Sequence, residues 1–202
     1  MKLILKSFVL FFLVLFFSSV FGQSIENLKT YPRQNHPIFR INMSAPIGVH
    51  FFASAEFNIT KKITLLPKAG IVSALGFRKE STAPELSNIS TAGFYSIELR
   101  RYINLISRFK RNRNINQNSG DYLGVKYFSS GPPFSKSNQF INFESTNSVQ
   151  LEYGMQRSIG QHFYWGSFIG FVVQDEFKSN VKNSPVGGFP LLQFGFNLGY
   201  TF

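Results

Sequence analysis

The sequence predicts an all-β protein, an antiparallel up-and-down transmembrane β-barrel with eight strands and a side-chain-filled lumen. Apolar and polar side chains alternate with a period of two in segments of about ten residues, which is typical of membrane-spanning strands. Hydrophobic residues make up 44% of the 202 residues and aromatic residues 17%, so the chain is rich in strand formers and too apolar for a disordered protein. The absence of cysteine excludes disulfide scaffolds, thiolate metal sites and thiol catalysis.

The N-terminus has the layout of a secretory signal peptide. Two lysines precede an unbroken apolar run over residues 8–17, and Gly22 supplies a small residue at the expected cleavage point. The alternative, a membrane-anchoring helix, needs about 20 apolar residues, and this run is shorter. We therefore expect three parts: a cleaved signal peptide at residues 1–22, a disordered periplasmic lead at 23–36 and the barrel at 37–202.

The first four predicted strands lie in the N-terminal half of the barrel. Residues 37–44 alternate over a short span and supply the eighth strand that an even-numbered, single-chain barrel needs. Residues 49–59 and 63–71 alternate apolar with small or polar residues, and a Thr-Lys-Lys link joins them. Residues 95–104 alternate in the same way and include several charged side chains.

The last four predicted strands follow the same rule. Residues 122–127 and 149–156 alternate, whereas residues 162–173 are apolar on both faces and carry two glycines on one of them. Residues 194–202 end the chain in strict alternation. Short links alternate with longer polar segments at 77–91, 131–146 and 175–189, which we expect to be extracellular loops, with both chain termini in the periplasm.

Six charged residues share the predicted inner face by their parity. A soluble sandwich or lipocalin-like barrel also alternates, but its dry core would not accept these charges unpaired. Because eight strands enclose an interior just wide enough for side chains, we predict an ion-pair network with equal numbers of acids and bases and no open channel. A proton or ion path is the functional alternative. The predicted network is Glu56, Glu98 and Glu152 against Lys68, Arg100 and Lys126, with Gln150, Gln156, Gln193 and Asn197 as polar filler.

A basic segment follows the fourth strand of this series and carries Arg108, Lys110, Arg111 and Arg113. The formal net charge of the chain is +11, but export by a signal peptide excludes nucleic acid as a partner. Strand counting from the C-terminus puts the segment in the periplasm, where it would contact anionic phospholipid headgroups or another envelope component. A solvated turn is the simpler alternative, and one miscounted strand would place the segment against lipopolysaccharide outside.

No catalytic, cofactor or metal site is predicted. Of the three histidines, only His50 has plausible catalytic partners, Ser54 and Glu56. On one strand these lie roughly 13 and 20 Å away, at about 3.3 Å per residue, which is too far for a triad. The chain has no Gly-rich phosphate loop and no metal-ligand spacing.

The C-terminal residues Phe196, Leu198, Tyr200 and Phe202 resemble the strand that outer-membrane proteins present to the barrel-assembly machinery. More broadly, residues from about 38 to 202 resemble the small outer-membrane β-barrel domain proteins of Gram-negative bacteria. The resemblance implies an outer-membrane location, membrane lipid and the assembly machinery as partners, and a structural or interaction role. The alternatives are a lipid-modifying barrel enzyme and a soluble secreted lipocalin-like binding barrel.

Overall fold

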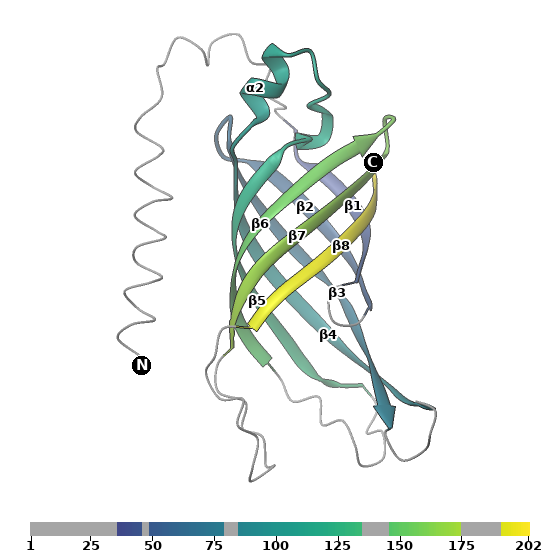
Figure 1. Ribbon diagram of the computed structural model, residues 1–202. Coiled ribbons are helices and arrows are strands. Elements are labelled where there is room, and N and C mark those ends of the chain that lie inside the picture. The colour runs from purple at the N-terminus through teal and green to yellow at the C-terminus, as the bar shows by residue number, and fades with distance from the viewer. Residues whose placement is uncertain (1–35, 46–48, 79–84, 135–145, 175–190) are drawn as a thin grey trace, which may run out of the picture. The chain divides into compact units, whose positions relative to one another are not determined.

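The computed structural model describes residues 36–45, 49–78, 85–134, 146–174 and 191–202 (Figure 1). The predicted signal peptide, the predicted lead up to residue 35 and the predicted loop at 175–189 lie outside the described residues.

Eight antiparallel strands form a closed barrel in which each strand pairs with the next and β8 pairs with β1 (Figure 1). The predicted fold class, an antiparallel up-and-down eight-stranded barrel, is therefore confirmed, including the short strand expected at residues 37–44. The strands are β1 (Ile38–Ala45), β2 (Val49–Asn58), β3 (Ile63–Arg78), β4 (Glu85–Tyr102), β5 (Asp121–Pro133), β6 (Thr146–Ile159), β7 (Phe163–Gln174) and β8 (Leu191–Thr201).

The loop expected over residues 77–91 was too long. β3 continues to Arg78 and β4 begins at Glu85, and the two strands pair along this whole length, with Gly76 opposite Asn88. The expected loop at 131–146 was also too long, because β5 reaches Pro133 and β6 starts at Thr146. Strand pairing uses backbone hydrogen bonds, so polar residues extend a strand beyond the stretch where apolar alternation reveals it.

Successive side chains point alternately into and out of the barrel. Among the described side chains, the inward positions are even-numbered in β1 to β7 and odd-numbered in β8. The outward positions carry large apolar side chains that are well exposed, such as Phe39 at 54%, Ile169 at 48% and Phe194 at 75%. The outer surface of the described barrel is thus apolar, and much of its inner surface is polar.

Short turns and a helical connection share one end of the barrel, which we call the α2 end. The turns are residues 59–62 and 160–162, and Gly160 takes the positive φ of 62° that its turn needs. The connection from β4 to β5 contains helix α2 (Leu105–Lys110) and the 3-10 turn η2 (Asn116–Asn118). Figure 1 shows that β8 ends at this same end of the barrel.

Candidate functional site in the barrel interior

The centre of the barrel holds a cluster of charges around Glu98. This carboxylate is fully buried and accepts hydrogen bonds from Lys68 Nζ and from Arg100 Nε and Nη2, the last at 3.2 Å. Arg100 also donates from Nη1 to Gln156 Oε1 at 2.9 Å. Nearby, Lys126 Nζ lies 3.3 Å from Glu152 Oε2. Five of the six residues of the predicted ion network therefore pair with one another.

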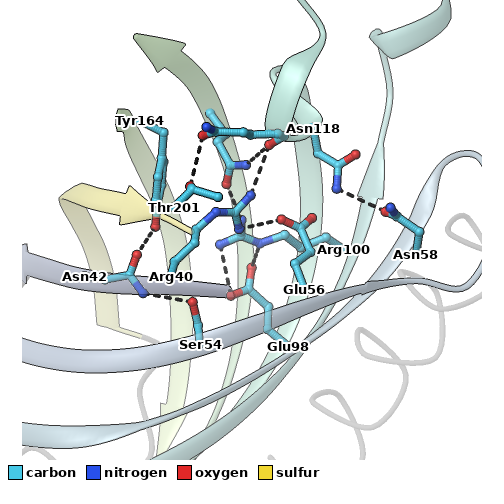
Figure 2. A network of polar contacts seen from close by, with 12 residues as sticks. Arg40, Asn42, Ser54, Glu56, Asn58, Glu98, Arg100, Asn118, Tyr164 and Thr201 are labelled. Carbon is cyan, nitrogen blue, oxygen red and sulfur yellow. Dashed lines mark hydrogen bonds and ion pairs between the residues drawn. The ribbon is translucent and has the colours of Figure 1, made fainter. Parts of the chain in front are cut away.

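The sixth, Glu56, pairs with a residue that the parity argument had omitted. Arg40 Nη1 donates to Glu56 Oε2 at 2.6 Å, and the Tyr102 hydroxyl donates to Glu56 Oε1 at 2.8 Å. Figure 2 shows this pair beside the Glu98–Arg100 pair. The expected equality of acids and bases was wrong, because within the described lumen four cations face three carboxylates. Arg40 lies on the short strand β1, whose inner face adds the fourth cation.

Two tyrosine rings lie against the guanidinium groups of the arginines. The Arg100 guanidinium lies 4.1 Å from the ring centroid of Tyr122, and that of Arg40 lies 4.7 Å from the ring of Tyr164, at cation–π distance. Glycines on neighbouring strands make room for both rings. A Cβ added at Gly154 would lie 2.4 Å from Tyr122 Cζ, and one at Gly199 would lie 2.2 Å from Tyr164 Cε1.

Residues 112–120, which we call the cap, close the α2 end of the lumen. The Gln117 carbonyl oxygen accepts hydrogen bonds from Arg40 Nη2 at 3.1 Å and from Gln156 Nε2 at 2.6 Å. Gln117 Oε1 accepts another from the Thr201 hydroxyl at 3.1 Å, and Asn118 Nδ2 donates to Asn58 Oδ1 at 3.0 Å (Figure 2).

The cap is itself held to the barrel wall. Ser119 is 1% exposed, and its hydroxyl accepts from the backbone N–H of Ser158 at 2.7 Å and donates toward the Asn116 carbonyl at 2.7 Å. Gly120 O accepts from the Gln156 N–H at 2.9 Å. Gln117 and Asn118 adopt left-handed φ values of 53° and 57°. Sequence reasoning missed this inserted cap, and its one signal was a connection unusually long for the periplasmic side.

The opposite half of the lumen is aromatic. Phe52, Val72, Ala92 and Phe94 form a buried cluster against which Phe128 packs. His50 joins this cluster, with its ring centroid 5.4 Å from that of Phe94. The hydroxyl of Ser54 instead accepts from Asn42 Nδ2 at 2.8 Å, and Glu56 is engaged by Arg40. His50 thus packs against the rings of Phe94 and Phe128, while Ser54 and Glu56 are engaged by other residues.

The remaining predicted filler residues also lie on the inner face. Gln150 is buried, while Gln193 and Asn197 are partly buried. His162 lies at the α2 end, where its Nδ1 is 3.1 Å from the Thr201 carbonyl oxygen.

Among the described residues, no group of three His, Asp or Glu side chains is arranged to hold a metal ion. No helix in the described ranges is long and apolar enough to cross a membrane.

The residues of the predicted basic turn lie in and just after helix α2, whereas the sequence predicts a turn there. Arg108 donates from Nη2 to the Asn114 carbonyl oxygen at 2.9 Å and so ties α2 to the cap. Burial lowers the pKa of the Arg108 guanidinium, and the charge of Arg157 lowers it further. Lys110, Arg111 and Arg113 are exposed.

The residues that resemble an assembly signal lie on the outer face of β8. Phe196, Leu198 and Tyr200 are 43%, 41% and 38% exposed, and Phe202 follows the strand at 73%. Phe196 stacks on Trp165 of β7, with ring centroids 5.9 Å apart, and Tyr200 packs edge-on against Phe163.

Comparisons with known proteins give little beyond this geometry. No family model matches the chain, and no curated protein matches it. Among solved structures, the N-terminal β-barrel domain of Pseudomonas aeruginosa OprF is similar, with a TM-score of 0.48 and 8% identity over 84% of this chain and 98% of that domain. A likeness at this level carries no functional argument. The strand pairing of the chain itself assigns it to the closed, eight-stranded, antiparallel β-barrels.

Proposed function

We propose that the chain is an outer-membrane β-barrel protein with a structural or interaction role and no open pore. The observation that carries this proposal is the polarity of the barrel. Charged side chains such as Glu56 and Glu98 are fully buried inside, while large apolar side chains cover the outside of the described strands. A soluble lipocalin-like barrel needs the reverse arrangement, with its apolar face inward.

The amount of exposed apolar surface supports a lipid environment. Soluble monomers rarely expose a contiguous apolar patch of more than a few hundred Å². Here, outward Phe, Ile, Leu, Tyr or Val side chains are exposed on every strand of the closed barrel. Tyr200 and Trp165 lie on the outside near the α2 end, where aromatic residues of membrane barrels meet the headgroups.

Three layers of side chains support a closed lumen. The cap fills the α2 end, the ion pairs of Glu56, Glu98 and Glu152 fill the centre and the aromatic cluster fills the other half. An eight-stranded barrel has an interior only wide enough for such filling. The loops beyond β3, β5 and β7 would then be the surfaces open to partners outside the cell. In this proposal, the signal peptide directs export of the chain, and the C-terminal aromatic strand directs its assembly into the membrane.

Membrane fractionation combined with a gel-mobility assay tests this proposal. The full chain is expressed in a Gram-negative host, and the detergent-extracted protein is run with and without boiling. We expect the protein in the outer-membrane fraction, with faster migration before boiling because a closed barrel resists unfolding in the gel. A protein that stays in solution without detergent and shows one mobility would overturn the proposal and favour the soluble binding barrel.

A further inference from the structure

Seven exposed or partly exposed cationic side chains gather at the α2 end of the barrel, beside the buried Arg101. They come from three separate parts of the chain: the turn between β2 and β3, the α2 connection and the end of β6. We call this set the cationic rim. Its residues are Lys61, Lys62, Arg108, Lys110, Arg111, Arg113 and Arg157.

Of the acidic side chains that the structure describes, one lies at the rim. Among the described residues, Asp121 is the acid at this end of the barrel, and it is bonded to Arg157 and to Asn104. The other acidic residues whose side chains the structure describes, Glu56, Glu98 and Glu152, lie in the lumen. The α2 end is therefore strongly positive as a surface.

The rim borders directly on the apolar exterior. Ile59, Ile159 and Phe163 are 52%, 54% and 58% exposed. Ile59 lies two residues before Lys61, Ile159 lies two residues after Arg157, and Phe163 pairs with Ile159 across the sheet. Ile103, which precedes α2, is 47% exposed. A strand rises about 3.3 Å per residue, so the cations lie within roughly 7 Å of the apolar side chains. This spacing matches the short distance between the hydrocarbon core of a membrane and its headgroups.

The α2 connection holds its charges in place. Leu105 is buried, and a Cβ on Gly120 would lie 2.8 Å from Leu105 Cδ2, so the helix packs closely against the cap. The Ile103 N–H donates to the Asp121 carbonyl oxygen at 2.9 Å, and Arg108 is bonded to Asn114 O. Lys110, Arg111 and Arg113 are exposed on this fixed support.

We propose that the cationic rim binds the headgroups of anionic phospholipids in the membrane leaflet next to the α2 end. This inference rests on the proposed function, which places the barrel in a bilayer. The positive rim complements the negative headgroups, and its position beside the apolar belt brings the lipid phosphates within reach. Each basic residue close to an anionic membrane surface raises the affinity of a protein for that surface several-fold.

Native mass spectrometry of the folded protein in detergent tests the proposal. Palmitoyl-oleoyl phosphatidylglycerol and palmitoyl-oleoyl phosphatidylcholine are titrated separately, and the dissociation constant of the first bound lipid is compared. The test variant is K110Q/R111Q/R113Q. The matched control, K136Q/K178Q/K182Q, removes the same charge from the connections that join strands at the other end.

We expect the wild type to bind phosphatidylglycerol about tenfold tighter than phosphatidylcholine, with a preference that falls in high salt. The test variant should lose most of that preference and the control should keep it. K61Q/K62Q, on a separate turn of the same rim, should weaken it in the same direction. Equal binding of both lipids by the wild type, or equal loss in the test and control variants, would overturn the proposal.

The gel-mobility assay separates this outcome from failure of the proposed function. If the gel mobility of the wild type changes on boiling but the protein binds both lipids equally, the membrane barrel is supported and the lipid site is wrong. If the wild type never reaches a heat-modifiable state, the membrane barrel itself is wrong.

Discussion

The Arg40–Glu56 pair gives the sharpest prediction about the lumen. Both side chains are at most 1% exposed, with 2.6 Å between Nη1 and Oε2. Glu56→Gln keeps the shape and an acceptor for the Tyr102 hydroxyl but leaves the Arg40 charge without its carboxylate. Breaking a buried pair in this way costs about 3–5 kcal/mol. In a water-filled lumen, the same pair would be worth only about 0–1 kcal/mol.

The assay is urea unfolding of the protein refolded into phosphatidylcholine vesicles, followed by the fluorescence of Trp165, the single tryptophan of the chain. We expect Glu56→Gln to lower the free energy of unfolding by about 3 kcal/mol or more. The double variant Arg40→Met/Glu56→Gln removes both charges and should recover at least about 2 kcal/mol of this loss. A loss below about 1 kcal/mol, with no recovery in the double variant, would refute a dry, filled lumen.

Two further variants test the packing and the cap. Gly154→Ala places a Cβ 2.4 Å from Tyr122 Cζ and should lower the free energy of unfolding by about 1–3 kcal/mol in the same assay. The control is Gly131→Ala, whose added Cβ would have its nearest neighbour 3.8 Å away and should change the free energy of unfolding little. Equal effects of the two variants would count against the tight packing of the Tyr122 ring. Ser119→Ala leaves the partly buried Ser158 N–H without its acceptor and should speed tryptic cleavage after Arg113 roughly five- to thirtyfold, with exposed Ser107→Ala as the control. An unchanged cleavage rate would mean that the cap is not held as described.

Most of the barrel is predictable from the sequence because a period of two fixes which face each residue joins. Once Phe194 and Phe196 are placed outward, Asn197 and Thr201 must point inward, as the structure has them. The even strand number then identifies residues 37–44 as a strand. The alternation reveals only the part of a strand that crosses an apolar environment. The paired extension of β3 and β4 beyond Val72 and Ala92 therefore escaped the analysis.

The interior was only partly predictable for a related reason. Parity places Glu98, Lys68 and Arg100 inside, but it does not say which carboxylate meets which cation, because that depends on register across strands. Arg40 was omitted although it lies on the same inner face. Gln117 reaches the lumen from a connection with no periodicity, so its contacts with Arg40 and Gln156 arise only when the chain is folded.

Ion conductance across a planar lipid bilayer tests the central claim of a filled barrel most directly. Protein that shows the boiling-dependent shift is inserted, and current is recorded under voltage in concentrated potassium chloride. Since the cap, the ion clusters and the aromatic cluster together occupy the lumen, we expect no steady current above that of the bare bilayer. Reproducible single-channel steps from the folded wild type would contradict the account and show that an aqueous path runs through the barrel.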